Sequence, residues 1–325
     1  MLKWTSKLVG CLAAAAMALA GGGALAQSDY PTRPITFVVP YAAGGATDVA
    51  VRVIAEAMAR DVGQNIVVVN KAGGGATIAA KSVAEAAPDG YTVLVAVAAN
   101  LITNPIILDN VGYDPIADFE PVSLLSANPV ILVSSKESGF TTLGEVIEAA
   151  KADPGVIPVA SYGIGTPSHL AIELLEAQAG IDLIHIPFNG GAPAQTALMG
   201  GHVPLMMNIL PSEVEPLKAG EVVGLAIGQM KESAFAPGVP TFSEAGVKDF
   251  EALTFFGLVV PAGTPRAIVE RLNAAAQTAL TDENVVATLT RQGMAIWPTT
   301  AEGFGEMIAT ETTKWAPIIK AAGLK

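Results

Sequence analysis

The sequence predicts an α/β protein with mostly parallel sheets, folded as two lobes of similar topology. Short apolar segments of strand length alternate with helical patterns, which is typical of parallel sheets covered by helices. The order strand, glycine loop, helix, strand, glycine loop, helix, strand occurs twice along the chain. A chain of 325 residues is long enough for two domains, although one larger doubly wound sheet would also fit this length.

The first repeat begins with the apolar segment ITFVV at 35–39, followed by the glycine loop YAAGGATD at 41–48. Residues 49–60 predict an amphipathic helix, because their apolar side chains recur at helical spacing. The rest of this repeat is expected to comprise a strand at 65–70, a glycine loop at 71–77, a helix at 78–87 and a strand at 91–97.

The second repeat follows the same order. It is expected to comprise a strand at 157–161, a glycine loop at 162–168, a helix at 169–178 ended by Gly180, a strand at 183–187, a glycine loop at 188–194, a helix at 195–199 and a strand at 203–207. Asn100 and Asn208 are expected to end the third strand of their repeats. Asparagine is a common turn residue, but these matched positions favour a role in a cleft between the repeats.

Two extended segments, 119–135 and 250–263, flank the second repeat and are interpreted as crossovers that form a hinge. Lobe 1 is therefore expected to comprise 27–124 and 254–325, and lobe 2 to comprise 125–253. After the second crossover, Thr264 and Pro265 predict the start of a helix at 266–280. The spacing of Thr299 and Glu302 predicts a capping box at the start of the last helix.

Residues 1–26 have the pattern of a secretory signal peptide. Lys3 and Lys7 precede an apolar segment at 8–19, and the small residues 24–26 form a cleavage site after Ala26. The alternative, a membrane anchor, is disfavoured because the apolar segment is short and is followed by glycines. The mature protein is therefore expected in the periplasm.

The composition excludes several classes of function. The formal net charge of −12 argues against nucleic-acid or anionic membrane partners. The single cysteine, Cys11, lies in the predicted signal peptide, so no disulfide, thiolate metal site or cysteine nucleophile is expected in the mature chain. An acidic protein that binds an anion must then provide local positive potential by other means.

The four glycine loops suggest how such a site is built. Each is expected between a strand end and a helix start, where free backbone N–H groups attract anions without lysine or arginine. Ligands of open α/β sheets bind beyond the carboxyl ends of the strands. One such loop alone would be interpreted as an ordinary turn, whereas four in two repeats indicate a shared cleft. A complete dinucleotide or phosphate-loop motif is not present in the sequence, so no cofactor is expected.

The sequence gives little support to catalysis. It has no Gly-x-Ser-x-Gly motif, and its three histidines, His169, His185 and His202, do not have metal-ligand spacing. We therefore expect neither a catalytic residue nor a metal site, although a nucleophile–base pair formed in three dimensions stays possible.

Some polar residues of the glycine loops are candidates for ligand contact. Asp48 either stabilises a helix start or accepts a hydrogen bond from the ligand, and Thr47 either caps the helix or binds the ligand. Thr166 is expected to be the N-cap before Pro167. That arrangement leaves the hydroxyl of Ser168 free for ligand contact.

Seven segments together resemble one family. They are PYAAGGATD (40–48), KAGGGAT (71–77), AAPDGYTV (86–93), YDPIADFEPVSLL (113–125), YGIGTPSHLA (162–171), IPFNGGAPA (186–194) and VPAGTP (260–265). Their order and spacing, from about residue 30 to the C-terminus, resemble the Bug-type extracytoplasmic receptors of tripartite tricarboxylate transporters.

The resemblance implies a type II periplasmic binding protein with a Venus flytrap fold, which holds a small carboxylate in its cleft and delivers it to a membrane permease. A monomer without cofactor is expected. The implied first-lobe contacts are Tyr41, Ala42, Gly44, Gly45, Thr47, Asp48, Thr77 and Asn100. The implied second-lobe contacts are Tyr162, Thr166, Ser168, Asn189, Gly190 and Asn208.

Three positions depart from the usual family pattern: Thr77 stands where asparagine is common, Asn189 where lysine is common, and Asn208-Ile209 where Asp-Asn is common. The distal group of the ligand is therefore open between charged, neutral, aromatic and amino-bearing. Two alternative functions use the same cleft, a periplasmic hydrolase or lyase and a receptor that presents its ligand to a sensor.

Overall fold

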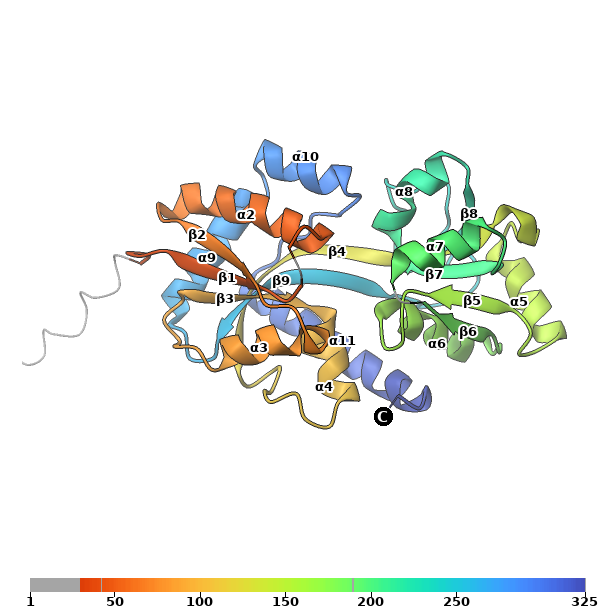
Figure 1. Cartoon of the computed structure of the whole chain (residues 1–325), viewed down its shortest axis with the longest axis horizontal. Coiled ribbons are helices and arrows are strands. Elements are labelled where there is room, and N and C mark those ends of the chain that lie inside the picture. The colour runs from red at the N-terminus through yellow and green to blue at the C-terminus, as the bar shows by residue number, and fades with distance from the viewer. Residues whose placement is uncertain (1–29, 42, 189, 325) are drawn as a thin grey trace, which may run out of the picture.

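The computed structural model describes residues 30–41, 43–188 and 190–324. The predicted signal peptide at 1–26 and its cleavage after Ala26 lie outside the described residues, as do Ala42 and Asn189. The described chain forms an α/β fold with two halves, connected by two long strands that cross the centre of the molecule (Figure 1).

The first half is built on three parallel strands. Strand β1 pairs with β2 on one side and with β3 on the other. The elements up to the first crossover are β1 (Ile35–Val39), α2 (Ala46–Val62), β2 (Ile66–Asn70), a 3-10 turn (Gly74–Ala76), α3 (Thr77–Ala84), β3 (Thr92–Val97), a π-helical turn (Ala99–Thr103) and α4 (Asn104–Ile107).

The second half repeats this plan. Strand β5 pairs in parallel with β6 and with β7. Its elements are a 3-10 turn (Lys136–Ser138), α5 (Leu143–Ala152), β5 (Pro158–Ser161), α6 (Pro167–Ala179), β6 (Ile184–Pro187), α7 (Gly191–Met199), β7 (Leu205–Ile209), α8 (Leu210–Lys218) and β8 (Val222–Ile227). Helix α6 ends at Gly180 in the left-handed conformation, as predicted.

The crossing strands β4 (Phe119–Ser135) and β9 (Leu253–Pro261) join the two halves into one hydrogen-bonded path. Strand β4 pairs with β9 as far as Pro129, and from Val130 onward it pairs with β7 and β8 instead. Strand β9 also pairs with β3. The change of partner at 129–130 therefore marks where the chain passes from one half to the other.

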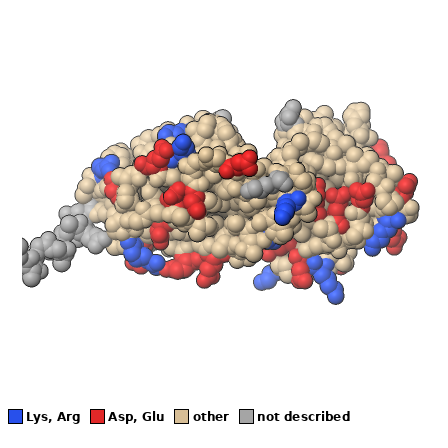
Figure 2. Space-filling model, turned by 90° about the horizontal axis from the view of Figure 1, so that it is seen from below, with Lys and Arg blue, Asp and Glu red and all other residues tan. Residues whose placement is uncertain are grey.

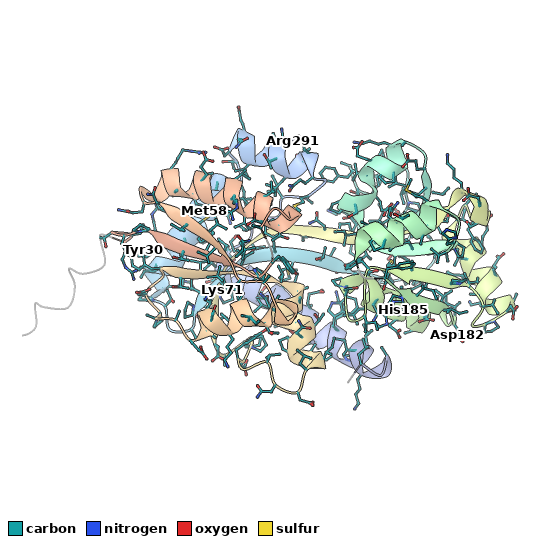
Figure 3. All side chains as sticks on the ribbon, in the orientation of Figure 1. Tyr30, Met58, Lys71, Asp182, His185 and Arg291 are labelled. Atoms are coloured by element: carbon teal, nitrogen blue, oxygen red, sulfur yellow. The ribbon has the colours of Figure 1, made fainter. Side chains whose placement is uncertain are left out.

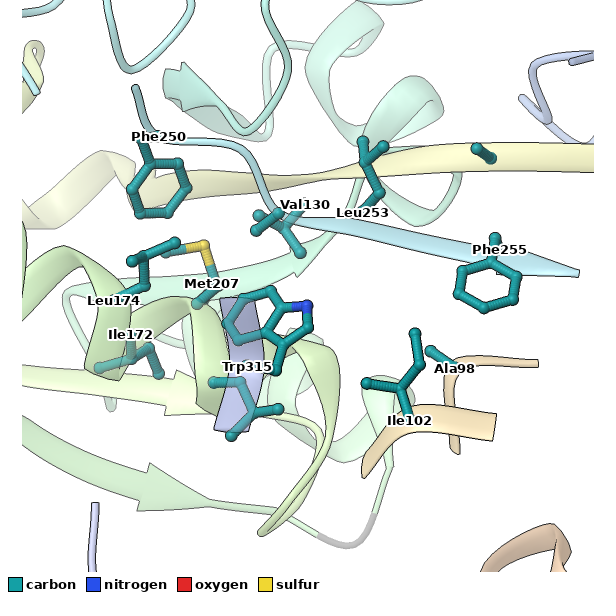
Figure 4. Packing of buried hydrophobic residues seen from close by; sticks show 14 of the residues in the cluster. Ala98, Ile102, Val130, Ile172, Leu174, Met207, Phe250, Leu253, Phe255 and Trp315 are labelled. Carbon is teal, nitrogen blue, oxygen red and sulfur yellow. The ribbon is translucent and has the colours of Figure 1, made fainter. Parts of the chain in front are cut away.

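The C-terminal helices return to the first half, and the last helix reaches the second. They are α9 (Arg266–Ala279), α10 (Glu283–Arg291) and α11 (Ala301–Ala321). Trp315 of α11 belongs to an apolar cluster that also contains Ile102 of the first half and Met207 of the second, as Figure 4 shows. Because this cluster is continuous, α11 connects the halves in addition to the two strands.

Two predicted N-caps are wrong by one residue, although α9 begins at Arg266 as predicted. The last helix is capped by Thr300, whose side chain accepts the N–H of Gly303, whereas the Thr299 hydroxyl accepts the N–H of Leu124. The N-cap of α9 is Pro265, and the Thr264 hydroxyl donates to the carbonyl of Pro261. In the first case the neighbouring threonine bonds the distant strand β4, and in the second it bonds the end of the strand just before the helix.

Candidate functional site

A cleft of about 540 Å³ lies between the two halves. Its walls are formed by the ends of β3 and β7, the loops that precede α2 and α6, the starts of α7 and α8, and the central part of the crossing strands. Every lining residue among those the structure describes is uncharged at neutral pH. Acidic side chains instead lie on the exterior of both halves, on the face seen in Figure 2.

Several helices begin at this cleft without a side chain to cap them. The N-cap residues of α2, α7 and α8 are Gly45, Gly190 and Ile209, and none of them caps its helix through a side chain, although Asn208 Oδ1 accepts the N–H of Ile209 at 2.9 Å. Thr47, Gly191 and Pro211, within the first turns of these helices, line the cleft. The unsatisfied N–H groups and helix dipoles therefore make the cleft locally positive without any cationic side chain.

Helix α6 differs because its start carries a side-chain cap. The hydroxyl of Thr166 accepts the N–H of His169 at 3.4 Å and donates to the carbonyl of Gly163 at 2.7 Å. Thr166 and Pro167 line the cleft together with Ile164. The cap thus holds the loop before α6 in a compact turn that faces the cleft.

Asp48 holds the loop before α2 in place without lining the cleft itself. Its carboxylate is buried and accepts hydrogen bonds from the N–H of Gly44 at 2.8 Å, from Arg52 Nε at 3.0 Å and from Asn70 Nδ2 at 2.8 Å. Burial alone would raise the pKa of this carboxyl, but the hydrogen bonds from Arg52, Gly44 and Asn70 outweigh it and lower the pKa to about 2. Both carboxylate oxygens are therefore engaged within the first half.

Two tyrosines face the cleft from opposite halves. Tyr41 precedes α2 and Tyr162 precedes α6, and both line the cleft. Burial raises the pKa of each phenol, and the nearby Tyr41 adds to the rise at Tyr162. Both hydroxyls therefore stay neutral at physiological pH and can donate a hydrogen bond to an anion between them.

The structure brings part of the predicted residue set to the cleft. Tyr41, Thr47, Tyr162, Thr166 and Asn208 line it. The described residues of the predicted set that do not line it are Gly44, Gly45, Asp48, Thr77, Asn100, Ser168 and Gly190.

Besides Asp48, the side chains of three of these residues bond to the protein itself. The Ser168 hydroxyl is buried and donates to the carbonyl of Met207 on β7, so the expectation that it is free is wrong. Asn100 does not end a strand. It lies in the π-helical turn, fully buried, where its Oδ1 accepts the N–H of Val97 at 2.9 Å. The Thr77 hydroxyl donates to the carbonyl of Gly74 at 2.7 Å.

A buried network supports Asn208, which is the penultimate residue of β7 and not its end. Its Nδ2 donates to Glu213 Oε1 at 2.5 Å, and Gln195 Nε2 donates to the other carboxylate oxygen at 3.3 Å. Burial raises the pKa of Glu213, although these two hydrogen bonds oppose the rise. The network orients the amide of Asn208 at the cleft wall.

Sequence reasoning missed polar residues of the crossing strands and of two helix starts. Asn128 of β4, Thr254 of β9, Asn104 of α4 and Ser212 of α8 line the cleft. Asn128 also accepts the N–H of Ala295 at 2.9 Å, so it connects β4 to the loop after α10. None of these residues stands beside a glycine motif, and a residue type alone could not have identified them.

The described residues contain no group of histidine, cysteine, aspartate and glutamate side chains that could hold a metal ion. In the same part of the chain, we find no helix with the length and apolar character needed to cross a membrane. A close Ser–His pair is present, because Ser161 Oγ lies 2.6 Å from His185 Nε2. Ser161 is fully buried and does not line the cleft, so this pair lacks the access that a nucleophile requires.

Two α/β lobes that enclose a cleft of helix starts define the class of solute-binding proteins. The model of the tripartite tricarboxylate transporter family receptor matches residues 50–324, and the chain belongs to this family. It is 33% identical to protein BugT of Bordetella pertussis over 95% of each chain.

Two solved structures share this fold and sequence. MatC of Rhodopseudomonas palustris with bound malate is 33% identical, with a TM-score of 0.74, and the match covers 89% of this chain and 100% of that one. An R. palustris protein with adipate is 31% identical, with a TM-score of 0.77 and coverage of 90% and 98%. These likenesses confirm the predicted family and fold class.

Proposed function

We propose that this chain captures a small carboxylate in the cleft between its lobes and delivers it to a membrane permease of the tripartite tricarboxylate type. The observation that carries the proposal is the convergence of three helix starts without side-chain caps on a cleft whose described lining is uncharged. Such a cleft suits an anion better than a cation. The malate and adipate bound by two relatives are small carboxylates.

In the proposed complex, backbone N–H groups at the starts of α2, α7 and α8 donate to the carboxylate. The hydroxyls of Tyr41, Tyr162, Thr47 and Thr166 and the amide of Asn208 add donors from both lobes. Hydrogen bonds to a charged acceptor in an enclosed cleft are stronger than those between neutral groups at the surface. Asp48 acts indirectly, by holding the loop before α2 in place, whereas Ser168 joins α6 to β7 and contributes to stability.

The hinge is proposed at 129–130 and 252–253, where β4 changes partner and β9 begins. Close contacts flank the cleft in this structure: a Cβ placed on Gly165 would lie 3.2 Å from Ile107, and one on Gly293 would lie 3.1 Å from Pro211. Each contact joins one lobe to the other. The ligand would therefore enter when the lobes separate and be enclosed when these contacts form.

The receptor is proposed to be monomeric, exported and processed after Ala26. The uncharged lining supports binding without catalysis, since no carboxylate, imidazole or amine lines the described part of the cleft as a general base.

Thermal unfolding of the mature chain, 27–325, with a carboxylate panel tests the proposal. Malate, adipate, short monocarboxylates and aromatic carboxylates are each compared with their neutral amides. A ligand at 100 times its dissociation constant should add about 2.7 kcal/mol of stability. A shift with one or a few carboxylates and none with the amides is expected. Equal shifts with acids and amides, or none with any acid, would overturn the proposal.

A further inference from the structure

Two histidines stack behind the second-lobe loop that lines the cleft. The imidazoles of His169 on α6 and His185 on β6 have ring centroids 3.9 Å apart and planes inclined by only 12°. His169 is 5% exposed, and Figure 3 places His185 in the second lobe. Stacked rings this close cannot both carry a positive charge without repulsion.

The hydrogen bonds of His169 define its protonation state. Nδ1 accepts the N–H of Gly165 at 3.0 Å, so this nitrogen carries no proton in the bonded form. The proton of the neutral ring is then on Nε2, which lies 3.3 Å from Glu173 Oε1. The imidazole therefore connects the helix surface to the loop only while it is neutral.

The bonded loop is the one that forms the second-lobe wall of the cleft. Gly165 lines the cleft between Ile164 and Thr166. Its φ of +71° favours glycine, so the loop has no side chain of its own at this point to hold its backbone. The imidazole of His169 supplies this anchor from the side opposite the cleft.

We propose that neutral His169 is the positioning residue of the second-lobe ligand loop, and that ligand affinity falls when His169 takes up a proton at Nδ1. The inference rests on the proposed function, because it assigns this loop to ligand binding. Protonation would place an N–H of the ring against the N–H of Gly165. The anchor would be lost, and the loop could no longer hold Thr166 and the start of α6 in place.

The groups that surround the ring of His169 set the pH at which it takes up this proton. The titratable groups that face the ring are Glu173 on the same helix and His185 on β6. Glu176 farther along α6 and Asp182 after its end border a groove whose α11 side is formed by the uncharged residues Pro317, Ile318 and Ala321. Burial lowers the pKa of His169 from its ordinary value of 6.5, so protonation requires a more acidic solution than it does for a free imidazole.

The sign of the pH effect follows from linkage. The ligand-bound form needs neutral His169, so it binds fewer protons than the free protein below the pKa of this residue. Affinity is then constant above that pKa and falls by up to about tenfold per pH unit below it.

Two substitutions of His169 separate the loss of its hydrogen bond to Gly165 from the gain of its positive charge. In His169→Asn, the amide Oδ1 takes the place of Nδ1 and accepts the Gly165 N–H without titrating. In His169→Gln, the amide reaches the Nε2 position and the acceptor at Nδ1 is lost. His202→Asn makes the same change at an exposed histidine outside the cleft and serves as the matched control.

The first measurement needs no ligand. Two-bond ¹⁵N–¹H correlations of the wild-type chain report the tautomer of His169, and amide hydrogen exchange reports the protection of Gly165. We expect the Nε2–H tautomer and a protected Gly165 amide in the wild type and in His169→Asn, with protection lost in His169→Gln. An Nδ1–H tautomer, or equal protection in all variants, would overturn the inference.

The second measurement is the affinity for malate and adipate by calorimetry between about pH 5 and pH 7.5. The affinities are first corrected for protonation of the ligand itself, which is the same for all variants. The corrected affinity of the wild type and of His202→Asn should fall on acidification. That of His169→Asn should not change with pH. His169→Gln should bind about 3- to 10-fold more weakly at neutral pH. A wild-type profile as flat as that of His169→Asn would overturn the inference. If neither acid binds the wild type, the proposed ligand class fails, while Gly165 exchange still decides the positioning role.

Discussion

The helix starts of the two lobes share a geometry but differ in chemistry. In each lobe the third residue of the helix bonds back to the N–H of the glycine that precedes the N-cap. Asp48 of α2 accepts from Gly44 at 2.8 Å, and His169 of α6 accepts from Gly165 at 3.0 Å. The first lobe thus uses a carboxylate, and the second uses an imidazole, for the same structural task.

The choice of acceptor determines how each loop responds to pH. Ionised Asp48 is held by Arg52 and also suits the positive end of the α2 dipole, so the first loop keeps its anchor in mildly acidic solution. His169 accepts only when neutral, and its positive form would oppose the dipole of α6. The first lobe should therefore be a constant half of the site and the second a pH-dependent half.

The largest effect is expected from Asp48→Ala. The substitution removes the buried carboxylate that is the shared acceptor for the N–H groups of Gly44, Arg52 and Asn70. Since breaking a buried charged network costs more than one neutral hydrogen bond, the free energy of unfolding should fall by about 2–4 kcal/mol. Urea denaturation of the mature chain measures this loss.

Glu56→Ala provides the control on the same helix. The Glu56 side chain is 71% exposed and pairs only with Arg60 among the described contacts. Its loss should change the free energy of unfolding by less than about 0.5 kcal/mol. If Asp48→Ala costs no more than Glu56→Ala, the first-lobe carboxylate is not an anchor and the comparison between lobes fails.

The second prediction concerns the pH dependence of stability. Burial, with the neighbouring His169, lowers the pKa of His185 from 6.5 to about 4, and burial lowers that of His169. The unfolded chain therefore binds more protons below pH 6.5, and stability should decrease there by up to about 1.4 kcal/mol per pH unit for each proton. The contribution of Asp48 should be lost only between about pH 4 and pH 2.

Urea midpoints measured across this range test the assignment. The double variant His169→Asn, His185→Gln should have a flatter profile between about pH 6.5 and pH 5 than the wild type. Equal profiles would show that the two imidazoles do not titrate with folding. A wild-type loss confined to the range below about pH 4 would assign the effect to carboxylates instead.

The comparison also shows which parts of the fold could be predicted. Strand β1 and crossing strand β4 have the predicted bounds, 35–39 and 119–135, because an apolar run between turn residues is a local signal. Helix α8 (Leu210–Lys218) was not predicted, since Pro211 and Pro216 argue against a helix when only local propensity is considered. Packing of α8 on β4, β7 and β8 outweighs that propensity.

A site residue could be predicted from the sequence only where its orientation does not depend on a contact with a distant element. Thr47 could be placed at the cleft because glycine loops at strand ends determine where the backbone turns, whereas Tyr41, Tyr162 and Thr166 were assigned to it through the family resemblance. Ser168 belongs to the same loop, but its orientation is set by the Met207 carbonyl of a distant strand. Contacts of this kind are not encoded in the local pattern.

The second residues of α6 and α2 extend the comparison, because Ser168 and Thr47 occupy the same helix position. Ser168 is buried and bonds β7. Ser168→Ala should therefore lower the free energy of unfolding by about 1–2 kcal/mol and leave ligand affinity unchanged. Denaturation and calorimetry on the same preparation separate these effects. A loss of affinity at unchanged stability would instead support the direct ligand contact expected from the sequence.

Thr47 should show the opposite behaviour, with the smallest effect on stability. It lines the cleft at the start of α2, so Thr47→Val keeps the shape of the side chain and removes only the hydroxyl. Loss of one hydrogen bond to the ligand should weaken malate or adipate binding by about 3- to 10-fold, with the free energy of unfolding unchanged within about 0.5 kcal/mol. Thr313→Val, at an exposed position of α11 outside the cleft, is the matched control and should bind normally. If Thr47→Val instead reduced stability and spared affinity, the second residue would be structural in both lobes, and the two helix starts would differ only in the acceptor that holds the glycine.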